Sequence, residues 1–395
     1  MRNKRLDLLR GVAVLLVLFH HGDIHNLLQK SGWVGVDLFF VLSGFLISGL
    51  LFAEYRKRKS IDFMRFFIRR GLKIYPSFYI FLAATFLLQF RFHTTRPAQD
   101  YLRELLYVQN YGSSAWEHTW SLAVEEHFYI LLPIFLFALI RFSRDRGDRF
   151  RGIPLSFLLI AVGCLTLRSA AAWGAHSEAL AEWPTPKRFY APTQLRIDSL
   201  FFGVLLGYLH HHRPAFLERL LLPARNRIAM AALSTALISY CVFFSAGTRV
   251  IVSFGFTLLY LGFGLLLLLC LHVHNILPAR LGGLLAPVGS IFASIGAYSY
   301  SIYLWHLAVQ AWAPALVSRI IHVQLDPRAR FLIYFVGSIG VGIFMSRLVE
   351  YPILRIRDRF YPATRTVESG VTLLSLDTPR EHLARPLPSG DNLTR

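Results

Sequence analysis

Charged residues are scarce in this chain, making up 16% of its 395 residues, whereas soluble domains usually carry about 25%. Cysteine, with three residues, is also rare, and neither a CxxC nor an HExxH pair occurs, so no disulfide framework and no metal site is expected. The apolar fraction of 54% and the mean hydropathy of +0.46 exclude an ordinary water-soluble enzyme and a disordered chain.

The charge that is present is mostly positive, with 42 Lys and Arg against 23 Asp and Glu and a formal net charge of +19. A nucleic-acid partner is not expected, because 33 Phe in long apolar runs serve no purpose in such a protein. Membrane topology explains the basic excess better, since loops rich in Lys and Arg stay in the cytoplasm.

Apolar stretches of about 17–25 residues predict an all-α polytopic membrane protein with ten transmembrane helices. The loops between them alternate between basic and weakly charged, which places both chain ends in the cytoplasm. The predicted spans lie near 7–22, 33–53, 74–90, 124–141, 153–173, 195–211, 228–246, 250–271, 288–311 and 330–350.

One transmembrane domain over 1–362 and a flexible cytoplasmic tail over 363–395, rich in Ser, Thr, Pro and mixed charge, are expected. The basic start and apolar run of the chain imitate a signal peptide, but no small-x-small cleavage site follows, so we expect an uncleaved first span. The cysteines all lie in apolar runs rather than outer loops.

The first span contains two ionisable groups, Arg10 and His21, which is unusual because such groups are costly in a bilayer. Their separation corresponds to about 20° around a helix and roughly 16 Å along it. One helix thus aligns a cation near the inner boundary with an imidazole near the outer one. The alternative is that Arg10 reaches lipid headgroups and His21 ends a helix in the interface.

Further polar candidates lie on other spans. Asp37 on the second span is expected near the outer edge, level with His21, and Ser43 and Gly44 allow close helix approach; an ordinary packing helix with an interfacial Asp is the simpler interpretation. Arg70 and Lys73 share a helical face and could hold phosphates, although basic residues before them also suit anionic lipid.

Adjacent carboxylates, Glu125 and Glu126, enter the fourth span, where they could orient an imidazole. Asp198 and the pair Trp305 and His306 are expected at the same depth, although His306 alone is more simply a structural histidine. Arg168 is expected to pair with a carboxylate that the sequence does not specify. Acidic and imidazole groups thus gather in the outer half, and Arg10, Arg70 and Lys73 at the inner boundary.

Together these segments resemble the membrane-bound acyltransferase family 3, over about residues 6–360. The resemblance is carried by the ordered series Arg10…His21, 35–47, 69–76, Trp120–Tyr129, Arg196–Gly203, Ser299–His306 and Glu350–Pro352. Two positions depart from the family pattern, with Lys73 where Arg is common and Ala308 where Pro often follows the Trp-His pair. Because His20 precedes His21, the choice between these histidines depends on spacing.

The resemblance implies an O-acyltransferase of the bacterial inner membrane that moves an acyl group, commonly acetyl, from acyl-CoA to a hydroxyl of an envelope saccharide. It implies His21 as the catalytic histidine and Arg10, Arg70 and Lys73 as the essential basic set. No esterase-like domain follows the membrane part, so a second transfer outside would need another protein. The oligomeric state stays open.

We expect the CoA phosphates to bind at Arg70, Lys73 and Arg10. His21 is expected to act as general base or as acyl carrier. Glu125 or Glu126 is expected to fix the ring's tautomer. The acceptor could equally be a glycan, a lipid-linked sugar or another hydroxyl compound. A proton-coupled transporter is the alternative function, since buried His and Glu also suit proton relays, and a lipid-binding scaffold is a third.

Overall fold

The computed structural model describes residues 3–23, 27–92, 94–145, 147–175, 186–244, 248–272 and 279–362. Within these residues the regular structure is helical and contains no strand, which confirms the all-α prediction. The first half contains α1 Lys4–His21, α2 Leu27–Ser31, η1 Gly32–Val34, α3 Gly35–Arg58, α4 Phe63–Phe92, α5 Ala98–Leu105, η2 Gln109–Tyr111, η3 Glu117–Thr119, α6 Trp120–Phe142 and α7 Ile153–Gly174. The second half contains η4 Lys187–Phe189, η5 Thr193–Leu195, α9 Ile197–His212, α10 Pro214–Leu221, α11 Ala224–Phe243, η6 Ile251–Gly255, α12 Phe256–His272, α13 Ala279–Ala297, α14 Ser299–Ile321, α15 Pro327–Met345, η7 Ser346–Glu350 and α16 Tyr351–Phe360.

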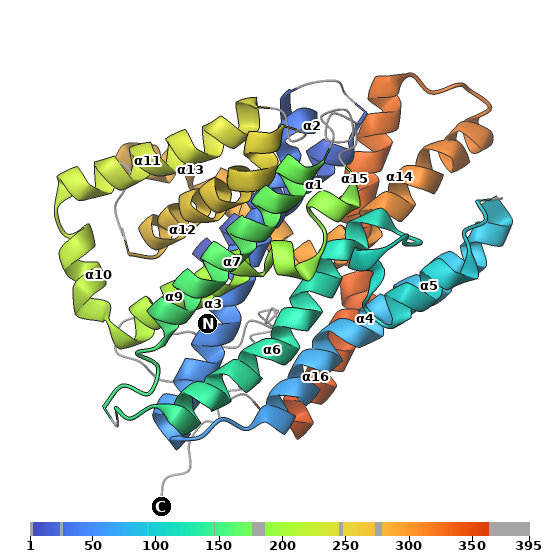
Figure 1. Ribbon diagram of the computed structural model, residues 1–395. Helices are drawn as coiled ribbons and strands as arrows, with labels where there is room; N and C mark the ends of the chain where they lie inside the picture. The colour runs from blue at the N-terminus through green and yellow to red at the C-terminus, as the bar shows by residue number, and fades with distance from the viewer. Residues whose placement is uncertain are drawn as a thin grey trace, which may run out of the picture.

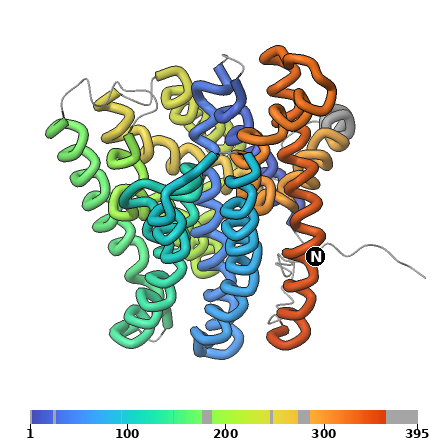
Figure 2. The backbone as a smooth tube through the Cα atoms, turned by 90° about the vertical axis from the view of Figure 1, so that its right-hand side faces the viewer, coloured from blue at the N-terminus to red at the C-terminus, as the bar shows by residue number. Residues whose placement is uncertain are grey.

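Among the described residues, seven helical segments are long and apolar enough to cross a membrane. The protein is therefore a multi-pass membrane protein, while the count of ten spans and the cytoplasmic placement of both ends stay predictions. In Figures 1 and 2 the long helices lie side by side in one bundle. The predicted tail over 363–395 lies outside the described residues.

Two predicted boundaries are wrong. The ninth span, predicted at 288–311, is two helices, α13 and α14, which meet at Tyr298. Averaged hydropathy joins the two helices into one span, although the polar run Ser299–Ser301 lies where α14 begins. The third span begins eleven positions earlier than predicted, because α4 starts at Phe63, so Arg70 and Lys73 lie within a helix rather than in a loop before it.

The predicted inner loops gather on one side of the bundle. The Phe52 ring near the end of α3 lies 5.0 Å from the Phe150 ring before α7 and 5.3 Å from the His212 ring at the end of α9. Arg69 near the start of α4 contacts Asp358 of α16 at 3.1 Å. We call this side inner, following the charge pattern; α4 and α16 begin and end near it at the bottom of Figure 1.

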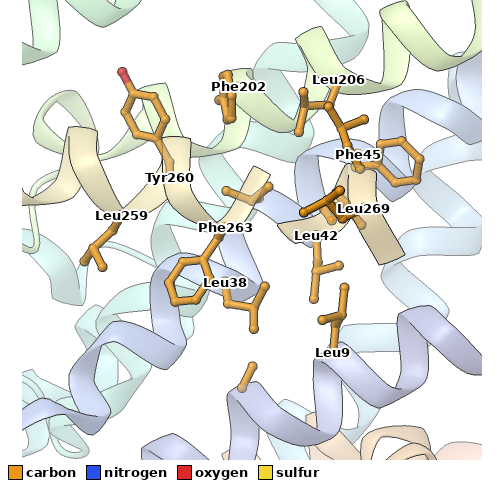
Figure 3. Close-up of a cluster of buried hydrophobic side chains, with 14 of the residues drawn as sticks. Leu9, Leu38, Leu42, Phe45, Phe202, Leu206, Leu259, Tyr260, Phe263 and Leu269 are labelled. Carbon is orange, nitrogen blue, oxygen red and sulfur yellow. The ribbon is translucent and has the colours of Figure 1, made fainter. Parts of the chain in front are cut away.

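Glycines let the helices around the site approach closely. A Cβ at Gly44 of α3 would overlap the Leu200 carbonyl oxygen of α9, and a Cβ at Gly11 of α1 would overlap the Phe292 carbonyl oxygen of α13. This confirms the predicted small-residue packing at Gly44. Between α3, α9 and α12, apolar side chains interlock in the core that Figure 3 shows around Leu38, Leu42, Phe45, Phe202 and Phe263.

Apolar side chains on the bundle's periphery are exposed, as expected where helices face lipid. On α7, Leu155, Leu158 and Leu159 each expose more than half of their surface. The three cysteines, Cys164, Cys241 and Cys270, form no disulfide. The charged groups discussed below instead lie inside the bundle, where burial must be offset by partners or by a hydrated space.

Candidate active site

A cavity between α1, α3, α4, α6, α14 and the η7–α16 junction brings several predicted residues together. The cavity has a volume of about 90 Å³, and the space rises to about 980 Å³ when the open solvent at its mouth is included. Its polar lining comprises Arg10, Ser43, Arg70, Lys73, Ser121, Glu125, Glu126, Ser299, Tyr300, Tyr303, Glu350 and Tyr351. The predicted basic set of Arg10, Arg70 and Lys73 therefore faces one space, which helical spacing on α4 makes possible for the latter two.

The carboxylates share that space with the cations instead of lying apart from them. Glu125 accepts hydrogen bonds from Ser43 Oγ at 3.0 Å and from Tyr129 Oη at 2.6 Å. Glu126 accepts one from Tyr75 Oη at 3.1 Å. The guanidinium carbon of Arg70 lies 4.0 Å from the centre of the Tyr129 ring. The predicted segregation of acid outside and base inside is wrong for this pair.

Glu350 supplies a third carboxylate to the cavity. It accepts hydrogen bonds from Ser301 Oγ at 3.0 Å and from Ser346 Oγ at 2.8 Å, which ties α14 to η7. Glu350 belongs to a motif of the predicted family but was assigned no role from the sequence. Ser299 in the first turn of α14 lines the same cavity.

His21 lies at the outer end of α1, next to two other imidazoles. Its Nδ1 hydrogen-bonds the Val17 carbonyl at 3.0 Å, and its ring centre lies 4.9 Å from the ring centres of both His20 and His306. Gln310 of α14 donates to the His21 carbonyl oxygen. His21 is not part of the cavity lining.

The expectation that Glu125 or Glu126 orients the His21 ring stays a prediction. In the structure Glu125 bonds Ser43 and Tyr129, Glu126 bonds Tyr75, and His21 Nδ1 bonds the Val17 carbonyl. His118, just before α6, is level with His306, their ring centres being 4.7 Å apart. Glu125 and Glu126 follow His118 by about two helical turns, which is roughly 10–12 Å along the axis. The carboxylates therefore belong to the cavity rather than to the histidines.

Two side chains of the cavity wall contact these histidines on their other side. Ser121 Oγ and Tyr303 Oη, both at the cavity wall, are 2.6 Å apart, and Tyr303 Oη donates to the His118 carbonyl at 2.8 Å. The Tyr303 ring centre also lies 5.5 Å from that of His306. One layer of side chains thus separates the cavity from His306, which in turn contacts His21.

Two other predicted site residues, Asp37 and Asp198, lie in buried ion pairs outside the cavity lining. Asp37 Oδ1 is 2.7 Å from Arg196 Nη2, and Asp198 Oδ2 is 2.8 Å from Arg168 Nη2. All four side chains are at most 2% exposed. The expected carboxylate partner of Arg168 is therefore Asp198. Arg168 also donates to the Leu195 carbonyl at 2.6 Å, so this group joins α3, α7 and α9.

Trp305 is buried in an aromatic cluster rather than lining the cavity. Its ring centre lies 5.2 Å from that of Phe81 of α4, and Phe81 lies 5.6 Å from Trp116. The ring of Trp116 lies beneath the guanidinium of Arg96, 4.2 Å away. The ring centres of Phe81 and Trp116 lie 6.1 and 6.5 Å from that of His118, so this aromatic cluster packs beside His118.

Glu104 of α5, which precedes Trp116 in the chain, is a buried carboxyl that the sequence did not predict. Its Oε1 accepts from the Trp116 backbone N–H at 2.6 Å, and burial raises the pKa of Glu104 to about 8. Burial also lowers the pKa of the nearby Lys187. His118 was missed too; the available signal was a histidine placed immediately before a polar-rich span.

These features define a class: a multi-pass helical membrane protein with a charged internal cavity. The chain matches the acyltransferase domain family over residues 3–347 and belongs to that family. The predicted family and the predicted enzyme class, acyltransferase, are thereby confirmed.

Several characterised or named relatives are similar to this chain. The peptidoglycan O-acetyltransferase OatA of Listeria monocytogenes is 26% identical over 368 residues, covering 88% of this chain and 55% of OatA. The putative peptidoglycan O-acetyltransferase YrhL of Bacillus subtilis is 29% identical over 77% of this chain and 48% of YrhL. A putative O-acetyltransferase of Staphylococcus aureus is 31% identical over 52% of this chain and 34% of its own length.

The chain thus spans about half the length of the curated relatives it matches. No solved structure matches it.

Proposed function

We propose that the protein transfers an acetyl group from acetyl-CoA, on the inner side, to a hydroxyl of a cell-envelope saccharide on the outer side of the inner membrane. The observation that carries this proposal is the cavity that joins Arg10, Arg70 and Lys73 to the wall formed by Ser121 and Tyr303. The family and the names of the relatives support acetyl transfer, and peptidoglycan is the first acceptor to test.

The basic residues of the cavity suit the charge of the donor's phosphates. Arg70 and Lys73 offer N–H donors to CoA phosphates near the inner side of α4, and Arg10 extends this basic set across α1. The neutral pantetheine arm then occupies the volume toward Ser121 and Tyr303. The carboxylates Glu125, Glu126 and Glu350 balance the cations there, so they favour an uncharged arm over further phosphates.

His21 is proposed as the base. A carbonyl oxygen can only accept a hydrogen bond, so Nδ1 bonded to the Val17 carbonyl carries the hydrogen and Nε2 carries the lone pair. Nε2 takes the proton of the acceptor hydroxyl as its oxygen attacks the thioester carbon. The C–O bond forms, the C–S bond breaks, and the proton passes to the leaving thiolate.

The covalent variant starts from the same lone pair. Nε2 attacks the thioester carbon, and the thiolate leaves as the C–S bond breaks. The acceptor oxygen then attacks the acyl carbon, the C–N bond to Nε2 breaks, and the hydroxyl proton passes to the freed imidazole and on to the thiolate. Trapping an acyl-protein with labelled acetyl-CoA in the absence of acceptor would distinguish this route from direct transfer.

The test uses the purified full chain in detergent with labelled acetyl-CoA and peptidoglycan fragments or other glycans. Acceptor-dependent release of CoA and a labelled glycan ester are the expected results, and His21→Ala should give neither. Solute uptake by reconstituted vesicles, with no dependence on CoA, would instead favour the proton-coupled transporter and overturn the proposal.

A further inference from the structure

Three imidazoles from three separate elements meet, and one of them is the proposed base, His21. His21 comes from α1, His118 from η3 and His306 from α14. The His306 ring lies between the others, with its centre 4.9 Å from that of His21 and 4.7 Å from that of His118. His118 is 3% exposed and His306 is fully buried. Two additional buried imidazoles beside a reacting one need an explanation.

Each ring is anchored in the same way, by one nitrogen on a backbone carbonyl. His21 Nδ1 bonds the Val17 carbonyl, His118 Nε2 the Leu304 carbonyl at 3.1 Å, and His306 Nδ1 the Tyr303 carbonyl at 2.5 Å. Because a carbonyl only accepts, the anchored nitrogen of each neutral ring carries the hydrogen. The second nitrogen of each ring is therefore a basic lone pair.

Among the described residues, two of these basic nitrogens have no hydrogen-bond partner: His118 Nδ1 and His306 Nε2, both buried. An unsatisfied buried acceptor costs about 1–3 kcal/mol, so a fold that packs these two rings 4.7 Å apart loses stability there. These two lone pairs can accept the proton that His21 takes up during the reaction.

We propose that His306 and His118 form a proton-holding pair for His21, an inference that rests on the proposed function. The proton that His21 Nε2 takes from the acceptor hydroxyl is shared with His306 Nε2, and His118 adds a second acceptor behind it. The same proton returns through His21 to the thiolate released when the C–S bond breaks, so the proton balance closes. His306 and His118 are thus positioning residues that act through His21.

The groups that face the three histidines favour return of the proton to the cavity. His20 on α1 contacts His21. The Arg96 guanidinium lies over the Trp116 ring, whose centre is 6.5 Å from that of His118. Tyr303 of α14 packs against both His118 and His306, and Tyr334 of α15 donates to the Leu18 carbonyl beside His21. The positive charge of Arg96 disfavours a proton on His118, so the proton returns toward the cavity.

The experiment compares His306→Gln and His118→Gln with the wild type, because Gln keeps an N–H donor for the carbonyl but has no basic nitrogen. We expect kcat to fall about 10²-fold for His306→Gln and less for His118→Gln, with KM for acetyl-CoA within about twofold of wild type. The matched control is His127→Gln on α6, whose ring bonds Thr193 away from the three histidines; it should keep wild-type kcat.

A second measurement separates a proton role from a structural one. His306→Ala is supplied with imidazoles of graded basicity, and the restored rate should rise with basicity. Rescue that does not depend on basicity, or full kcat in both Gln variants, would overturn the proposal. If His306→Gln fails to fold, judged by detergent thermal unfolding, the His118→Gln kcat and its pH profile decide. An inactive wild type would instead refute the proposed function itself.

Discussion

Two groups of buried charged residues lie on either side of α3, and their charges are compensated differently. In one group the charges form direct ion pairs, and in the other they line a cavity. Asp37 and Arg196, with Asp198 and Arg168, form direct ion pairs that are at most 2% exposed. Ser43, about 120° around the same helix, faces the cavity that holds Arg70 and Glu125. Direct pairing indicates a group that holds helices together, whereas open space beside charge indicates a group that receives a ligand.

The largest expected effect on activity comes from the histidine end of the cavity. His21→Ala should lower transfer about 10²–10⁴-fold, because the proposed base is lost, while thermal unfolding in detergent stays near wild type. His20→Gln is the matched control and should remain active. Activity in His21→Ala together with loss in His20→Gln would reverse the assignment of the two neighbours.

Breaking the paired group should instead affect folding. Arg196→Met leaves Asp37 charged and unpaired, which should cost about 3–5 kcal/mol of unfolding free energy. The double variant Arg196→Met with Asp37→Leu should recover most of that loss. Thermal unfolding in detergent measures both. A stable but inactive double variant would show that the pair also serves the reaction, contrary to the comparison.

Arg70 tests the ligand side of the comparison. Arg70→Gln removes a proposed phosphate contact and should raise KM for acetyl-CoA about 10–100-fold, since hydrogen bonds to charged groups contribute about 1.5–3 kcal/mol. Arg70→Lys should lie between Gln and wild type. Titration of the donor under saturating acceptor separates KM from kcat. A loss of stability with unchanged KM would place Arg70 with the structural group.

The close contact of α3 with α9 should be sensitive to a single methyl group. Gly44→Ala forces the helices apart at Leu200 and should cost about 1–3 kcal/mol. Gly163→Ala on α7 is the matched control, because an added Cβ there meets nothing within 4 Å. Unfolding temperatures of the two variants give the comparison, and equal values would contradict the packing argument.

A pH-dependent effect concerns Glu104, a buried carboxyl held by a backbone N–H. Its pKa of about 8 exceeds its ordinary value of 4.5, so between these values the folded form keeps a proton that the unfolded form releases. Stability should therefore fall as pH rises from about 5 to 8, by at most about 1.4 kcal/mol per pH unit. Glu104→Gln should flatten this slope, and Glu117→Gln on the exposed surface should not.

Much of this architecture could be predicted from sequence because each predictor is local. Hydropathy identified apolar helices, and the charge pattern grouped the inner loops that meet at Phe52, Phe150 and His212. Helical spacing placed Arg70 and Lys73 on one face, which indeed lines the cavity. The break at Tyr298 was missed because averaged hydropathy joins α13 and α14 across the short polar run Ser299–Ser301.

The same distinction between local and tertiary information applies to the site. Sequence alone identified the residue types, such as His21, Arg70 and the Glu pair, since ionisable groups in apolar spans are costly and therefore conspicuous. Their partners were set by depth and rotation between helices, which a single sequence does not encode locally. Only the tertiary structure decided that Glu125 faces Ser43 and Tyr129, that Asp37 pairs with Arg196, and that His118 and His306 stand behind His21.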